Sequence, residues 1–101
     1  MSGSPEQPQF HIVQTSEYRE GYANSVQIRV SVWDFLLMFG VMTQTTPEAV
    51  QIANFQGIYL SPQQAKALVN VLGQNVAQYE STFGEIKLDP RVTGTGSISI
   101  Q

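Results

Sequence analysis

The chain contains no cysteine among its 101 residues, and it carries few charges. Without cysteine, disulfides, thiolate chemistry and thiolate metal sites are excluded, so the fold depends on its apolar core or on partners. Five Lys and Arg residues stand against eight Asp and Glu residues, and the net charge is −3. This balance provides no basic surface for a phosphate backbone, and we expect no nucleic-acid partner.

Long hydrophobic runs are also absent. The longest, from Phe35 to Met42, is about half of the roughly 20 residues that a membrane span requires. The start of the sequence shows no basic patch followed by an apolar stretch, so no secretory signal is indicated. A hydrophobic content of 42% is too high for a disordered protein. We expect a single cytoplasmic domain with no membrane partner.

Two strands are predicted in the first half of the chain. Val26, Ile28, Val30 and Val32 alternate with polar residues, which is the period of a half-buried strand. A turn at residues 31–34 leads into a second strand over residues 35–43, which is apolar on both faces. Its two faces consist of Phe35, Leu37, Phe39 and Val41 on one side and of Leu36, Met38 and Met42 on the other.

A third strand and a helix are predicted to follow. The strand spans residues 49–60, and Gly57 marks a possible bulge within it. Ser61 is a favourable N-cap, Pro62 suits the first helical position and Gln64 completes a capping box. The helix then runs to Gly84. Its spacing predicts a buried stripe of Ala65, Leu68, Val69, Leu72, Val76, Tyr79 and Phe83.

The composition divides the chain into a disordered lead over residues 1–9, a single domain over residues 10–86 and a flexible tail over residues 87–101. Residues 10–14 form a candidate edge strand. Ile98 and Ile100 alternate with serine, so a strand formed against a partner is the alternative to disorder in the tail.

The predicted fold is therefore α+β, an antiparallel meander of three or four strands followed by one long C-terminal helix. One helix covers one face of a sheet, whereas the second strand is apolar on both faces. Burying four such side chains stabilises a structure by roughly 6 to 12 kcal/mol before entropy, comparable to the stability of a small domain. We therefore expect a homo-oligomer, with sheet packed on sheet or helix on helix. The candidate interface or partner-binding residues are Trp33, Phe35, Leu37, Phe39 and Val41.

A set of short motifs is spread over the predicted strands and helix, namely Tyr22-Ala23-Asn24, Asp34-Phe35, Ser61-Pro62, Ala65-Lys66, Asn75, Tyr79-Glu80 and Phe83-Gly84. Together these motifs resemble a small prokaryotic family known as domain of unknown function 3467. The resemblance covers Tyr22 to Ile86, and the family brings no established activity with it. A meander followed by a long helix is also similar in topology to SecB-type export chaperones, oligomers that hold unfolded chains in apolar grooves, although topology does not determine function.

No set of residues indicates catalysis. His11 is the only histidine and has no carboxylate or second histidine at ligand spacing, which excludes a triad and favours a surface position over a metal site. Asp34 is interpreted as a turn residue that caps backbone N–H groups, and nothing in the sequence pairs it with Glu80. Residues 94–96 lack the third glycine of a dinucleotide loop. We expect no enzyme activity, cofactor or metal.

Three other residues have structural and functional interpretations. Trp33 is either a packing residue or an anchor for a partner. Arg29 is expected to pair across the sheet or at a subunit boundary, and Asn75 to bond a neighbouring strand or helix. The predicted function is a non-catalytic oligomeric binding or adaptor protein, chaperone-like, that presents apolar sheet surface to a protein or peptide. The alternative is a structural component of a larger assembly such as a phage particle or shell.

Overall fold

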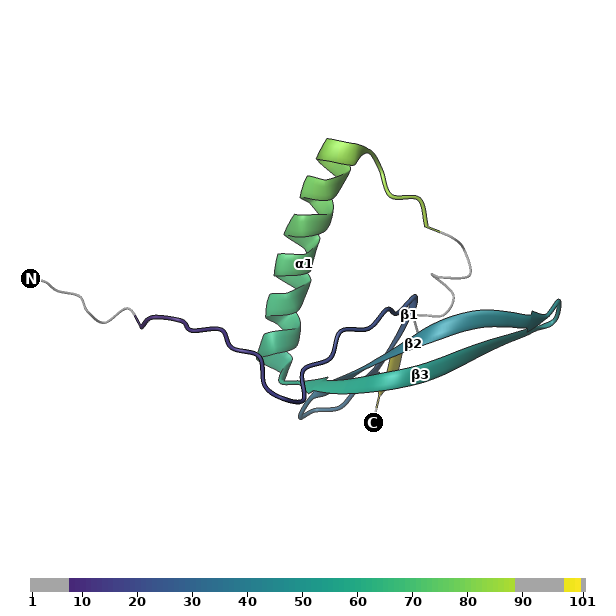
Figure 1. Ribbon diagram of the computed structural model, residues 1–101, viewed down its shortest axis with the longest axis horizontal. Helices are drawn as coiled ribbons and strands as arrows, with labels where there is room; N and C mark the ends of the chain where they lie inside the picture. Colours follow the sequence, from purple (N-terminus) through teal and green to yellow (C-terminus); the bar gives the residue numbers. More distant parts are fainter. Residues whose placement is uncertain (1–7, 89–97, 101) are drawn as a thin grey trace, which may run out of the picture.

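The computed structural model describes residues 8–88 and 98–100 and contains one sheet and one helix (Figure 1). The sheet has the strand order β3-β2-β1-β4. The predicted lead and tail lie mostly outside the described residues. The elements are β1 (Ser25–Val30), β2 (Phe35–Thr46), β3 (Ala49–Leu60), α1 (Pro62–Phe83) and β4 (Ile98–Ile100).

The predicted meander is confirmed. β1 and β2 pair antiparallel, and so do β2 and β3. β2 continues three residues beyond the predicted end, because Thr46 still pairs with Ala49 across a tight connection. Residues 10–14 are described and form no strand within the chain, so the candidate edge strand at this position is wrong for a single copy.

β4 pairs with β1 in parallel, with Ile28 opposite Ile98 and Val30 opposite Ile100. The alternation at Ile98 and Ile100 therefore corresponds to a strand, and its partner is the chain's own β1. A parallel neighbour requires a long connection, which here contains β2, β3 and α1.

A bulge interrupts the pairing of β2 with β3, but not at Gly57. Gly57 pairs with Met38 in regular register. One register shift falls where Phe39 pairs with Gln56 and Gly40 with Asn54, so Phe55 is the extra residue on β3, and a second lies between Gln44 and Thr46. The prediction of the bulge position at Gly57 is therefore wrong.

Gly40 is required at this bulge. A Cβ atom there would lie 2.8 Å from the carbonyl oxygen of Ala53, which belongs to the backbone and cannot swing away. We expect Gly40→Ala to lower the free energy of unfolding by about 1 to 3 kcal/mol. The matched control is Gly73→Ala on α1, where a Cβ meets nothing within 4 Å; it should raise stability by about 0.5 to 1 kcal/mol. Urea denaturation at equal protein concentration measures both, and equal stability of the two variants would contradict this account.

The β1–β2 turn is confirmed, with different capping from that expected. The Ser31 hydroxyl accepts hydrogen bonds from the N–H groups of Trp33 at 3.0 Å and Asp34 at 3.1 Å. The Asp34 carboxylate instead accepts a hydrogen bond from that hydroxyl at 3.1 Å. Ser31 is therefore the residue that caps the backbone, and Asp34 orients Ser31.

Both predicted ends of the helix are confirmed. The Ser61 hydroxyl accepts a hydrogen bond from the Gln64 N–H at 3.1 Å, and Pro62 opens α1. Gly84 ends it with a φ of 108°, and its N–H donates to the carbonyl oxygen of Glu80 at 2.9 Å. Glycine adopts this positive φ without the steric penalty of other residues.

The predicted burial of the α1 stripe is wrong for a single chain. α1 meets the sheet only at its base and then rises away from it (Figure 1). Ala65 is the only residue of α1 that is buried, and Leu68 is half-buried. The apolar side chains further along α1 are exposed, namely Val69, Leu72, Val76, Tyr79 and Phe83.

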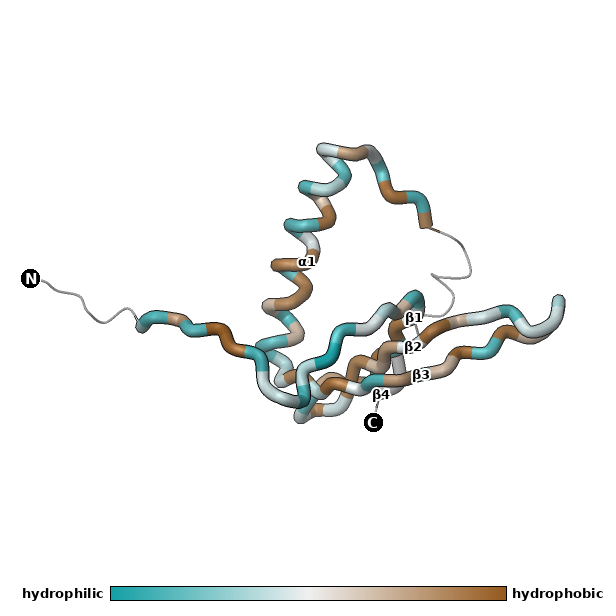
Figure 2. Tube along the Cα trace, viewed as in Figure 1, coloured by the Kyte–Doolittle hydropathy of each residue, from teal (hydrophilic) through white to brown (hydrophobic). Residues whose placement is uncertain are grey.

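The described chain has almost no core of its own. Ala65 is its only buried hydrophobic residue, and no large side chain is fully buried. Twenty large hydrophobic residues are exposed. Apolar stretches run along the strands and along α1, as Figure 2 shows. A single domain of ordinary stability buries a contiguous apolar core, and the described residues of this chain do not form one.

Candidate functional site

The apolar side chains of three strands gather on the sheet face toward which α1 stands, which we call the helix-side face. The register places Val26 opposite Phe39, Ile28 opposite Leu37 and Val30 opposite Phe35. β3 continues two of these rows with Ile58 and Leu60. Directly opposed residues of an antiparallel pair share a face, so these side chains form one apolar surface.

A first hollow lies where α1 leaves the sheet. It has a volume of about 420 Å³ and lies between the helix-side face and the first turns of α1. Lys66 is its only charged lining residue. The other lining residues are apolar: Ile28, Phe35, Leu37, Leu60, Pro62, Ala65, Leu68 and Val69.

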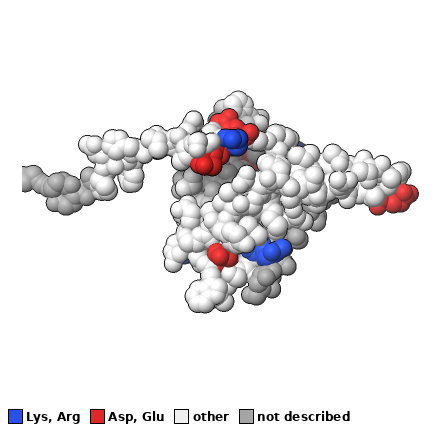
Figure 3. Space-filling model, turned by 60° about the horizontal axis from the view of Figure 1, so that its bottom comes forward, with Lys and Arg blue, Asp and Glu red and all other residues white. Residues whose placement is uncertain are grey.

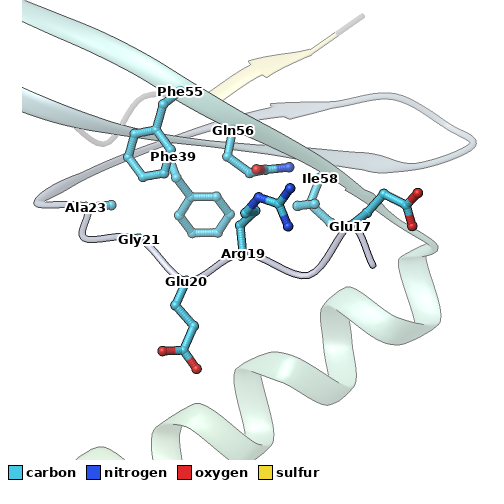
Figure 4. Close-up of a pocket in the computed structure, with 9 residues that line it drawn as sticks. All are labelled: Glu17, Arg19, Glu20, Gly21, Ala23, Phe39, Phe55, Gln56 and Ile58. Atoms are coloured by element: carbon cyan, nitrogen blue, oxygen red, sulfur yellow. The ribbon is translucent and has the colours of Figure 1, made fainter. Parts of the chain in front are cut away.

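A second hollow, of about 460 Å³, adjoins the first along the same face. Its floor consists of Phe39, Phe55 and Ile58, and the chain before β1 forms its wall (Figure 4). Ile58 lies directly opposite Leu37, which lines the first hollow, so the two form one open groove. We call this combined surface the helix-side groove.

Asn24 attaches the wall of the second hollow to the sheet. Its side-chain oxygen accepts a hydrogen bond from the Met42 N–H at 2.6 Å, and its side-chain amide donates to the Met42 carbonyl at 3.4 Å. Its backbone N–H donates to the carbonyl of Gly40 at 3.1 Å. This role explains Asn24 in the Tyr22-Ala23-Asn24 motif, since the amide continues the pairing of β1 with β2.

The groove is weakly charged except at its rim. Glu17, Arg19 and Glu20 line the second hollow beside the aromatic floor. Most of the surface that Figure 3 displays is likewise uncharged. Near the rim, the Tyr18 hydroxyl donates a 2.6 Å hydrogen bond to the Glu20 carboxylate, and this bond raises the pKa of Tyr18 above its ordinary value. This arrangement is suited to a ligand that has apolar side chains and a polar backbone.

The structure brings together three of the five predicted interface residues. Phe35, Leu37 and Phe39 line the helix-side groove. Val41 is half-buried beyond the bulge and lines neither hollow. Trp33 lies at the tip of the β1–β2 turn with 81% of its surface exposed. Within a single chain Trp33 is therefore not a core residue.

Sequence reasoning missed several groove residues. Ile28, Ile58 and Leu60 enter through strand register, which alternation along one strand does not reveal. Phe55 enters because the bulge adds a residue to β3. The wall over residues 17–23 had no detectable signal, since its composition is polar and resembles a loop.

The polar candidates do not assemble into a reactive site. His11 is exposed, and the described ranges contain no group of three or more metal-ligating residues. Glu80 accepts a hydrogen bond from the Ile86 N–H at 3.0 Å, while Asp34 lies in the distant β1–β2 turn. Asn75 donates to the Val71 carbonyl of its own helix, at 2.8 Å, instead of to a neighbouring element.

Arg29 lies on the sheet face opposite the helix-side groove. It pairs in register with Leu36 and lines a small recess with Tyr59. It is exposed, and it makes no ion pair within residues 8–88 and 98–100. The prediction of a pairing across the sheet is therefore wrong for the single chain, and a pairing at a subunit boundary stays a prediction.

Fold and site together define a small α+β protein with an open apolar groove and a helix whose apolar stripe is exposed beyond its base within the described residues. The chain belongs to the family described as "Protein of unknown function (DUF3467)", which it matches over residues 1–88. The match confirms the resemblance and extends it toward the N-terminus beyond Tyr22. No curated protein and no solved structure matches significantly, and the likeness to SecB-type chaperones is not confirmed. None of the described helices has the length and apolar character to cross a membrane.

Proposed function

We propose that this chain is a non-catalytic protein that assembles with copies of itself and binds a protein or peptide in the helix-side groove. The observation that supports this proposal is that the groove lies open and that no large side chain among the described residues is fully buried. Both hollows fall in the volume range of ligand sites, about 300 to 1,000 Å³. Their linings supply apolar contact with few fixed polar groups, which favours apolar side chains over a small polar substrate.

Assembly uses a different surface. Leu72, Val76, Tyr79 and Phe83 continue the α1 stripe beyond the groove, and the Tyr79 and Phe83 rings lie 4.9 Å apart. A second copy's helix packed along this stripe gives each helix the apolar cover that its own sheet does not provide. The helix-side groove then remains free to bind the protein or peptide partner.

A client assay tests this function. The protein is expected to bind a hydrophobic dye and to suppress the aggregation of a heat-denatured model client at near-equimolar concentration. Apolar groove side chains compete with client self-association, and this is the physical reason for the suppression. Light scattering of the client measures the effect. Absence of both dye binding and suppression, with large regular particles forming at high concentration, would instead favour the alternative of a structural component of a larger assembly.

A further inference from the structure

Residues 8–14 leave the fold as an extended arm, which we call the N-terminal arm (Figure 1). Phe10, Ile12 and Val13 are at least 79% exposed, and none of the arm's residues is helical or paired. Isolated exposed hydrophobic residues are common, but three within four positions of an unpaired extended segment are unusual. The arm therefore has the composition of a strand without a sheet.

The base of the arm is held in place. The Tyr18 N–H donates to the Thr15 carbonyl at 3.1 Å, which closes a turn. Arg19 donates from its guanidinium to the carbonyl oxygens of Ser16 at 3.0 Å and Tyr18 at 2.8 Å. These bonds fix the turn from which the arm leaves the body of the molecule (Figure 1).

The outer edge of β3 is an unprotected acceptor for a strand. β3 is the terminal strand of the sheet, and within the described residues nothing pairs with its outer side. Its twelve residues include no charge and no proline, the usual devices that block edge pairing. The strand at the opposite edge is β4, which has only three residues and offers a much shorter edge than β3.

We propose that the N-terminal arm of one copy adds as a strand to the outer edge of β3 in a second copy. Five residues, 10–14, span about 17 Å of extended chain, well within the roughly 40 Å length of a twelve-residue strand. The arm contains no Lys, Arg, Asp or Glu, and neither does β3, so no pair of like charges from these residues opposes the pairing. Backbone hydrogen bonds of this kind are the basis of strand addition in peptide recognition.

We assign the added strand to a second copy because every copy carries both an arm and a β3 edge, so the two are always present at equal concentration. In the structure the arm extends away from its own β3, and the exchange can be reciprocal, with each arm on the other copy's edge. This contact is independent of the helix-side groove. It goes beyond the proposed function, and either can fail without the other.

Disulfide scanning tests the pairing cleanly because the chain contains no cysteine. Full-length His11→Cys protein is mixed with single-cysteine variants at successive β3 positions from Val50 to Tyr59 and mildly oxidised. We expect cross-linked pairs at alternate positions, at least tenfold above an Asn70→Cys control on α1, since neighbouring residues of a strand point to opposite faces. Yields that show no alternation and do not exceed the control overturn the proposal.

Two further tests establish whether the contact uses backbone pairing and whether the arm comes from a second copy. Ile12→Pro removes a backbone N–H from an exposed arm and should lower cross-linking at least tenfold, whereas Ile12→Thr should stay within threefold of the parent. Unchanged cross-linking in Ile12→Pro rules out backbone pairing. A chain carrying His11→Cys and the best β3 cysteine should cross-link between copies; a disulfide confined to monomers in dilute solution would assign the edge to the chain's own arm and overturn the second copy.

Discussion

At micromolar concentration the chain should sediment as an assembly of two or more copies, and its unfolding midpoint should rise with protein concentration. Among the hydrophobic residues whose burial the structure describes, a single copy buries only Ala65. Each Leu, Val or Phe covered by another copy contributes about 1.5 to 3 kcal/mol, so four on the α1 stripe approach the whole stability of a small domain. Mass action then couples folding to association. Analytical ultracentrifugation and thermal unfolding across a hundredfold dilution measure both.

A matched pair of helix variants locates this contact. Leu72→Glu places a charge on the exposed α1 stripe and should weaken association at least a hundredfold, which corresponds to about 3 kcal/mol. Gln74→Glu adds the same charge on a different side of α1 and should stay within threefold of the parent. An 11.2 kDa species at every concentration, with a constant unfolding midpoint, would refute the assembly.

Client binding should fall at least tenfold in Phe39→Ser. Phe39 forms the floor of the second hollow beside Phe55 and Ile58, so the change removes an aromatic contact and leaves a polar group in its place (Figure 4). Trp33→Ala should lower client binding if the client reaches the β1–β2 turn, and Val32→Ala at the same turn is its control, since both side chains are about 80% exposed. Aggregation suppression and circular dichroism distinguish lost binding from lost folding.

The fluorescence of Trp33 provides a second readout. It is the only tryptophan, and its exposed ring should emit like a solvated indole and shift to shorter wavelength when a client or another copy covers it. If Trp33→Ala and Phe39→Ser leave both oligomer size and client binding unchanged, the binding surface has been placed wrongly.

Local signals predicted the elements well. The alternation at Val26, Ile28 and Val30, and the cap formed by Ser61 and Pro62, depend on interactions within a few residues, and the structure confirms both. Gly84 likewise ends α1 where expected. These features follow from backbone stereochemistry and short-range hydrogen bonding, which a sequence encodes directly.

Long-range features were predicted less well. The bulge lies at Phe55 because of the way β2 and β3 fit around Gly40, and no local signal distinguishes this position from Gly57. The parallel pairing of β4 with β1 depends on a connection through the rest of the fold. The wall of the second hollow depends on Asn24 bonding Met42, eighteen residues further along the chain.

By itself, the sequence determined that this protein is a cysteine-free α+β chain with a meander, one capped helix and more apolar surface than one helix covers. The hydrophobic period, the capping residues and the turn composition are local properties, so they can be recognised in the sequence without knowledge of the fold. Only the tertiary structure decided where that surface lies: α1 rises from the sheet instead of lying across it, and this leaves both the helix-side groove and the α1 stripe open. Ala65 is buried and Leu68 half-buried at the base of α1, whereas the stripe beyond them is exposed, and this change along one helix face cannot be read from a periodicity that is the same throughout.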